Sequence, residues 1–172
     1  MLPAGHIAAG YLAGKLATVV VPSLATPKFL FLTIIFAFLP DLDRLLAFAK
    51  IGKFTDSQDV NHRTFATHAP IFYLGIFCVW LVVFPTYQMQ AWSFIIGTMS
   101  HFAIDTLGAD GILWLFPFSE KMYKLTRDNK IIIDEDKFFI YWIGFFRKYV
   151  KLPSFKLEIV LVLISLLILF LT

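Results

Sequence analysis

Five long apolar stretches divide the chain, and polar or turn-forming residues separate each from the next. A helix needs about 20 mostly apolar residues to cross a hydrocarbon core about 30 Å thick. The pattern therefore predicts an all-α protein, a polytopic membrane bundle of about four to five transmembrane helices. The stretches cover residues 4–22, 28–48, 69–85, 91–108 and 156–172.

Two segments between the fourth and fifth stretches do not fit a span. Residues 111–118 (GILWLFPF) are too few to cross and contain Pro117, so we predict a re-entrant or interfacial segment. Residues 119–137 are polar and predict a short excursion with a small hairpin around Asp128 and Asn129, a helical turn being the alternative.

An aromatic segment follows this excursion. Residues 138–146 (FFIYWIGFF) run into a basic stretch, which is typical of a helix lying in the membrane interface. We therefore predict three parts along the chain. They are a metal-site membrane helical core at 1–118, a polar and interfacial cytoplasmic segment at 119–153, and a C-terminal transmembrane helix at 154–172.

Composition supports a membrane location. The chain is 59% hydrophobic and only 16% charged, and it contains one cysteine, Cys78. Soluble domains are about 45–50% apolar and about 25% charged. An ordinary soluble domain, a disordered chain and a disulfide-stapled secreted domain are therefore disfavoured.

The basic residues predict the orientation of the helices. The connection between the second and third stretches carries Lys50, Lys53 and Arg63, whereas residues 85–90 (PTYQMQ) carry none. Eight further Lys and Arg residues lie within residues 119–151. Short loops rich in Lys and Arg face the cytoplasm, so we expect an integral protein of the cytoplasmic (inner) membrane with a cytoplasmic N-terminus.

The same basic residues alternate with acidic ones beside the membrane, so lipid head groups are the expected partner and direct nucleic-acid binding is not expected.

The residues best suited to bind metal all fall at the cytoplasmic ends of the predicted helices. His101 and Asp105 are four residues apart, so they share a helix face and can bind one ion or each other. His62 and His68 are six apart and lie on different faces of a continuous helix, which leaves open which of them is a ligand. We predict a site recessed below the cytoplasmic surface. The candidate metal ligands are His6, Asp41, Asp43, His62, His68, His101 and Asp105.

Imidazoles combined with carboxylates suit zinc first, with manganese or iron as alternatives, whereas calcium and magnesium prefer oxygen ligands. A set of this size has room for one to three ions. A bound divalent ion lowers the pKa of a water molecule and so provides a nucleophile near neutral pH. The chemistry that these residues favour is therefore hydrolysis.

The motifs that carry these residues occur in a recognisable order. They are Gly5-His6, Leu39-Pro40-Asp41-Leu42-Asp43, His62-Arg63 through Thr67-His68, Ser100-His101 with Asp105, and GADGILWLFPF. Together they resemble the YdjM-like family of inner-membrane metal-dependent hydrolases over residues 6–118. The resemblance implies a helical, membrane-embedded metal site with the seven candidate ligands above. The family spaces the two histidines of the third motif five residues apart, whereas HRTFATHA spaces them six apart.

A looser likeness concerns the reaction. The order of His6, an aspartate, a middle histidine and His101-x-x-x-Asp105 is similar to that of the all-helical zinc-dependent phospholipase C and single-strand nuclease group, although later ligands of that group have no counterpart here. The likeness implies phosphoester hydrolysis, and a membrane location favours a lipid substrate. In this interpretation His68 is a ligand or a proton donor, and Arg63 meets the anionic substrate.

Two other interpretations fit the same residues. Buried Asp and His side chains also line the pathways of transporters and other ion-handling membrane proteins. A fully closed tetrahedral site would instead indicate a non-catalytic membrane protein with a structural metal. The sequence predicts no particular oligomeric state.

Overall fold

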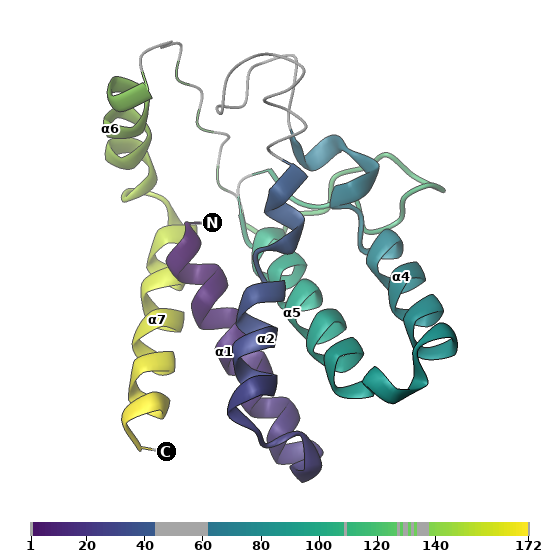
Figure 1. The fold of residues 1–172 in the computed structure, drawn as a ribbon. Coiled ribbons are helices and arrows are strands. Elements are labelled where there is room, and N and C mark those ends of the chain that lie inside the picture. Colours follow the sequence, from purple (N-terminus) through teal and green to yellow (C-terminus); the bar gives the residue numbers. More distant parts are fainter. Residues whose placement is uncertain are drawn as a thin grey trace.

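Helices make up the regular structure of the computed structural model (Figure 1). No strand occurs in the part of the chain that it describes, where the only strand-like pairing is an antiparallel bridge between Ile112 and Tyr123. The all-α prediction is therefore confirmed. The described residues are 2–43, 62–108, 110–126, 128, 131, 133 and 138–171.

The long helices follow the apolar stretches closely. Proline stands at or next to the first position of four of them, where its missing N–H costs no hydrogen bond. Short 3-10 turns connect them, including η2 (Leu39–Asp43), η4 (Ala66–His68) and η5 (Pro85–Tyr87). The helices are α1 (Pro3–Val20), α2 (Pro27–Phe36), α4 (Pro70–Val83), α5 (Gln88–Thr106), α6 (Phe138–Tyr149) and α7 (Pro153–Leu171).

The second predicted stretch differs most from the structure. It was expected to continue to residue 48, but α2 ends at Phe36 and the chain turns into η2. Pro40 lies within that turn, and proline removes a helical hydrogen bond and clashes with the preceding turn. Residues 44–48 lie outside the described residues.

Only α7, among the described helices, is by itself long and apolar enough to cross a membrane. Helices α4 and α5 pass the same test only as a pair, and the pair is bent by 118° at η5, so it forms a hairpin. Helices α2 and α4 extend for only about 15 and 21 Å, at about 1.5 Å per residue. The prediction of four to five spans is therefore not confirmed, although the helices that it requires are largely present.

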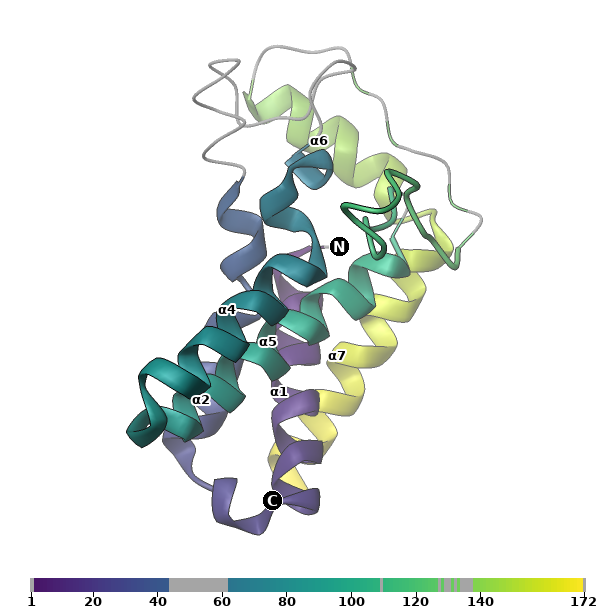
Figure 2. The ribbon, with the colours of Figure 1, turned by 90° about the vertical axis from the view of Figure 1, so that its right-hand side faces the viewer.

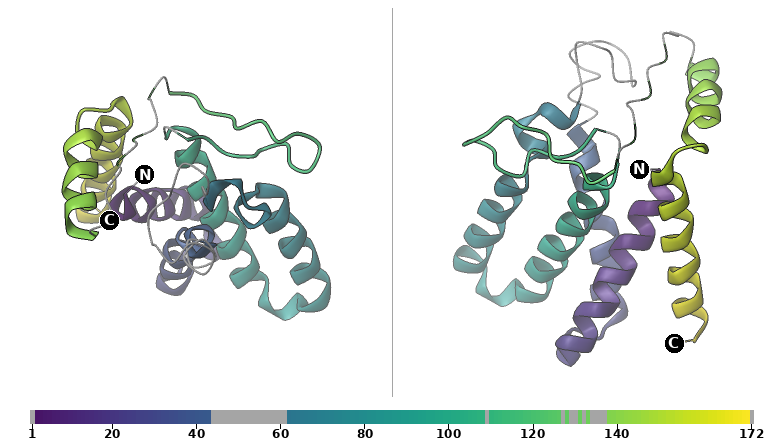
Figure 3. Two further views of the ribbon diagram at one scale, coloured as in Figure 1. Left: turned by 90° about the horizontal axis from the view of Figure 1, so that it is seen from above. Right: turned by 180° about the vertical axis from the view of Figure 1, so that it is seen from behind.

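Five helix ends meet at one end of the bundle. Helices α1, α2 and α5 pack against one another at the centre, with α4 beside α5 and α7 beside α1 (Figures 1 and 2). The starts of α1, α4 and α7 and the ends of α2 and α5 lie at one end of the bundle, and the C-terminus lies at the other (Figures 1 and 3). The up-and-down order predicted from the sequence produces this convergence.

Glycine permits the closest helix crossing. A Cβ atom on Gly97 of α5 would lie 2.5 Å from the carbonyl oxygen of Thr33 in α2. A Cβ atom on Gly10 of α1 would lie 2.9 Å from the Cβ atom of Ala37, just after α2. The backbone at the end of α2 therefore reaches the face of α5 that carries His101.

The loop after α5 folds back onto the end of that helix. Within residues 110–126, Leu125 donates a backbone hydrogen bond to the Thr106 carbonyl (2.9 Å), and the Trp114 indole N–H donates to the Thr106 hydroxyl (2.8 Å). Figure 3 shows this segment at the same end as the starts of α4 and α7. The segment expected to be re-entrant or interfacial, 111–118, is a non-helical loop, and its last residue, Phe118, is 93% exposed.

The polar segment after this loop contributes a cap for α7. Asp128 is buried, and its carboxylate accepts a hydrogen bond from the Ser154 amide (3.0 Å) in the first turn of the helix. The hairpin expected around Asp128 and Asn129 falls partly on Asn129, which lies outside the described residues. The aromatic stretch at 138–146 forms most of α6, so the helix predicted there is confirmed.

Candidate metal centre

Five of the predicted ligands lie together at the converging ends. We call this group the metal-ligand cluster, and it comprises His6, Asp41, His68, His101 and Asp105. Four of the five, all except His6, each offer one ligand atom, and these atoms lie within 4.8 Å of one another. The imidazole ring of His6 stacks on that of His101, with 4.1 Å between ring centroids. Helix α1, η2, η4 and helix α5 therefore each contribute to one site.

Asp105 is the common neighbour of the histidines. Its Oδ2 atom lies 3.3 Å from Nε2 of His101, as expected for residues four apart on a helix, and 3.6 Å from Nε2 of His68. Its other oxygen, Oδ1, lies 3.7 Å from Nε2 of His6. The contact between Asp105 and His101 follows from their spacing along α5. The contacts of Asp105 with His68 and His6 arise only because η4 and α1 pack against α5.

Hydrogen bonds behind two of the rings fix their orientation. The Nδ1–H group of His101 donates to the Ala37 carbonyl oxygen at the end of α2 (2.8 Å). The Nδ1–H group of His68 donates to Oδ2 of Asp43 (2.8 Å). Both rings therefore direct Nε2 into the cluster, which is how metal-binding histidines are commonly held.

Asp43 was predicted as a ligand, but the structure places it behind His68 rather than in the four-residue group. Asp41 and Asp43 are two residues apart in η2. Asp41 faces His6 and His101, while Asp43 faces the outer nitrogen of His68. The motif thus supplies one candidate ligand and one orienting carboxylate.

Most side chains of the metal-ligand cluster are buried, so their polar atoms need partners within the protein or a bound ion. His6, His68, His101 and Asp105 are fully buried, while the Asp41 side chain is 21% exposed. Among the described residues, the Nε2 atoms of His6 and His101 make no hydrogen bond. Buried polar atoms without such bonds are costly. Bound divalent cations would satisfy such nitrogens, so the residues present fit metal binding.

The carboxylates also control the protonation of His68. Burial lowers the pKa of its imidazole, but hydrogen bonds with Asp105 and Asp43 and their negative charges raise it more, so the pKa lies above its ordinary value. A divalent cation binds the neutral imidazole, so a metal ion and a proton compete for this side chain.

Arg63 lies beside the cluster. Its guanidinium is 2.9 Å from Oδ2 of Asp105 and 4.0 Å from the Asp110 carboxylate, and its side chain is almost completely buried. The residue predicted to meet an anionic substrate is therefore also an ion-pair partner of a candidate ligand. His62 begins η3 (His62–Thr64), but its side chain lies outside the described part of the structure, so its role as a ligand stays a prediction.

Glu158 is a residue that the sequence reasoning did not identify. It is buried in α7, where its carboxylate accepts hydrogen bonds from the amides of Gly5 (2.9 Å) and Leu2 (3.3 Å) and from the Tyr149 hydroxyl. A Cβ atom on Gly5 would lie 2.9 Å from this carboxylate. Glu158 therefore holds the first turn of α1, next to His6. Its signal in the sequence was a single carboxylate within an apolar stretch.

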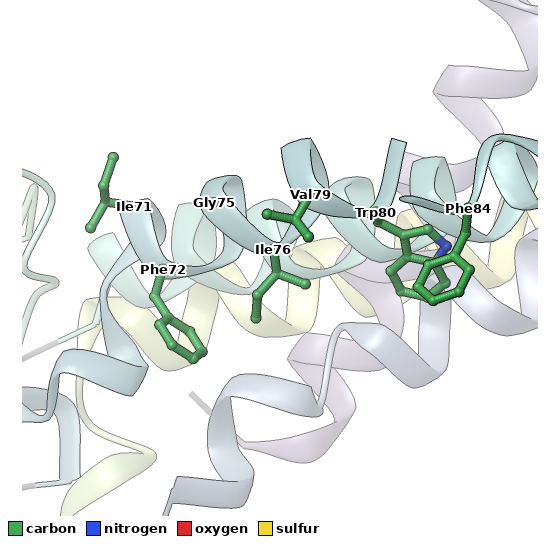
Figure 4. Close-up of a pocket in the computed structure, with 7 residues that line it drawn as sticks. All are labelled: Ile71, Phe72, Gly75, Ile76, Val79, Trp80 and Phe84. Carbon is green, nitrogen blue, oxygen red and sulfur yellow. The ribbon is translucent and has the colours of Figure 1, made fainter. Parts of the chain in front are cut away.

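An apolar depression of about 510 Å³ lies on the side of α4, separate from the cluster (Figure 4). Its first lining residue, Ile71, is only three residues after His68. The lining is almost entirely apolar, and Gly75 stands in the middle of it. The lining residues are Ile71, Phe72, Gly75, Ile76, Val79, Trp80 and Phe84.

Comparison with known families agrees with the motifs. The family model described as YdjM inner membrane protein matches residues 1–172, the whole chain. Neither the curated proteins nor the solved structures gave a match.

Proposed function

The chain belongs to the YdjM inner membrane protein family, and from its metal centre we propose that it is a membrane-embedded, metal-dependent hydrolase. The observation that carries the proposal is the buried group in which ligand atoms of Asp41, His68, His101 and Asp105 lie within 4.8 Å of one another. Its position at one end of the bundle, with Asp41 partly exposed, gives a substrate a route to it.

The donor set indicates the metal. Imidazole nitrogens with carboxylate oxygens favour zinc, with manganese or iron as alternatives. His68, His101, Asp41 and Asp105 would hold the ion, and Asp43 would keep His68 oriented. When bound, such an ion acts as a Lewis acid and activates water for attack near neutral pH.

We propose a phosphoester as the substrate class. The guanidinium of Arg63 places a buried positive charge beside Asp105, and guanidinium groups match the geometry of phosphate oxygens. Arg63 would therefore orient the phosphate and stabilise charge that develops on it. Asp43 holds Nδ1 of His68, so Nε2 is the atom that faces the cluster. If His68 does not bind the ion, the same Nε2 would be the proton donor to the leaving group.

A membrane lipid is the form of phosphoester that the surroundings favour. The apolar depression on α4 begins three residues after His68 and extends along the helix away from the centre (Figure 4). Apolar side chains there suit an acyl chain whose head group reaches the cluster. In the arrangement that we propose, four to five helices cross the inner membrane, with the N-terminus and the metal-ligand cluster on the cytoplasmic side.

The decisive experiment is elemental analysis of the purified protein, followed by hydrolysis assays on phosphoester and carboxylic-ester lipids with metal removed and restored. His101→Ala combined with Asp105→Ala should abolish metal retention and lower the hydrolysis rate at least about 100-fold. Ser100→Ala is the matched control, since its hydroxyl donates to the Gly97 carbonyl of its own helix (2.7 Å).

Two results would overturn the proposal. One is a purified protein without transition metal whose hydrolysis is unchanged in the double variant. The other is metal-ion flux into proteoliposomes, lost in the double variant, with no hydrolysis of any lipid tested. The second result would identify ion transport instead.

A further inference from the structure

A second cation position adjoins the four-residue group, and we infer that His6, Asp41 and Asp105 form it. The centre is then dinuclear, with both carboxylates shared between two divalent cations. The inference rests on the proposed metal centre but not on the proposed hydrolysis.

The carboxylates of Asp41 and Asp105 each direct one oxygen toward His6 and the other toward the remaining histidines. Oδ1 of Asp41 lies 3.9 Å from Nε2 of His101, whereas its Oδ2 lies 3.8 Å from Nε2 of His6. For Asp105, Oδ2 faces His101 (3.3 Å) and His68 (3.6 Å), whereas Oδ1 faces His6 (3.7 Å). The oxygens facing His6 are therefore different atoms from those facing the other two histidines. This division is what a pair of bridging carboxylates requires.

The surroundings of His6 are an independent reason to expect a second cation. It is fully buried, and within the described residues neither of its ring nitrogens makes a hydrogen bond. It does not belong to the four residues whose ligand atoms lie within 4.8 Å of one another. Its ring lies nearly parallel to that of His101, at an interplanar angle of 13°. A buried imidazole so placed is costly unless a ligand satisfies it.

The spacing of the atoms suits a small divalent ion. Metal-to-ligand bonds of about 2.0–2.2 Å in a tetrahedral site put ligand atoms about 3.4 Å apart, and Nε2 of His6 lies 3.8 and 3.7 Å from the two carboxylate oxygens. Three protein ligands leave a coordination position open, as at catalytic sites, whereas the other position has four. Paired ions about 3.5–4 Å apart are suited to phosphoester displacement. The position at His6 is therefore the one that would admit substrate.

The test is the number of ions that the full-length protein holds. Purified in detergent and loaded with manganese, the protein should retain about two ions per chain and give the electron paramagnetic resonance spectrum of an exchange-coupled pair. His6→Ala should retain about one ion and show an uncoupled spectrum. His6→Gln, which keeps a polar side chain of similar size, provides a second variant in case alanine prevents folding. Ile7→Ala, at an exposed neighbour on α1, should behave as the unsubstituted protein.

The outcomes separate this inference from the proposed function. A coupled pair without hydrolysis of any lipid supports the dinuclear centre and rejects the hydrolase. Hydrolysis by a protein that holds one ion, or two ions retained with unchanged coupling in both His6 variants, rejects the dinuclear centre formed by His6.

Discussion

Helices α5 and α7 have the same length, 19 residues, and opposite surroundings. Twelve residues of α5 are buried, and six of these are serine, threonine, histidine or aspartate. Only three residues of α7 are buried, and all are polar: Ser154, Glu158 and Ser165. One helix encloses polar groups at the centre of the bundle, and the other exposes an apolar surface. Half of the buried residues of α5 and all three of α7 are polar, as expected where lipid covers the outside of a bundle and ionisable groups face its interior.

Hydroxyl groups along α5 are satisfied within the helix itself. Ser93, Thr98 and Thr106 each donate to the carbonyl oxygen four residues earlier, at 2.7–2.9 Å. His101 and Asp105 instead face each other and the histidines of other elements, His6 and His68. Polar groups are therefore buried in two ways in α5: hydroxyls bond within the helix, and His101 and Asp105 form part of the metal-ligand cluster.

The largest effect is expected for a charge placed on the exposed, apolar side of α7, where it should reduce membrane insertion. Leu163 lies near the middle of this helix and is 60% exposed. If lipid covers that face, Leu163→Lys should disfavour membrane insertion by about 3 kcal/mol, measurable as the inserted fraction in a translocation assay. Leu163→Ala is the control and should insert almost normally. Equal insertion of both variants would show that lipid does not cover this face.

A smaller effect is expected where α5 crosses α2. Gly97→Ala would place its Cβ atom 2.5 Å from the Thr33 carbonyl oxygen, and backbone cannot move aside as a side chain can. We expect a loss of about 2 kcal/mol in stability, seen as a lower thermal midpoint in detergent. Gly75→Ala on α4 is the matched control, since its Cβ atom would meet nothing within 4 Å. It should leave stability unchanged or raise it by about 0.5–1 kcal/mol. Similar midpoints for both variants would contradict the close crossing.

The contact between α7 and α1 should have a slightly smaller effect. Glu158→Ala removes the acceptor for the Gly5 amide and the Tyr149 hydroxyl, at a cost of about 1.5 kcal/mol. Metal affinity should fall with it, because the same turn of α1 carries His6. Calorimetric titration with zinc measures this change. Ser165→Ala is the control, since its hydroxyl bonds the Val162 carbonyl of its own helix (2.8 Å). Unchanged affinity in the Glu158 variant would limit that residue to a structural role.

The smallest effect, on metal affinity, is expected at Asp43, the carboxylate that orients His68. Asp43→Asn keeps an acceptor near Nδ1 of His68 but removes its charge. Changes of this kind behind a ligand weaken metal binding about 10-fold or more, so we expect about a 10-fold higher dissociation constant with the same number of ions. Loss of a whole ion would instead identify Asp43 as a ligand.

The sequence alone determined the helical class, most helix boundaries and the residue types of the centre. Apolar stretches bounded by proline locate helix starts because proline is tolerated in a first turn. The four-residue interval between His101 and Asp105 puts both on one face because a helix repeats every 3.6 residues. The alternation of helix directions placed the remaining candidates at the same end.

Only the tertiary structure decided what each candidate contacts. The sequence treated Asp41 and Asp43 alike, but packing of η2 turned one toward the histidines and the other behind His68. It gave no reason to connect Glu158 with Gly5, which lies 153 residues away. The spacing of residues determines directions within one helix, whereas the atoms that meet at this centre come from separate helices and turns. Their positions depend on how closely those elements pack, and the small residues at the crossings decide that.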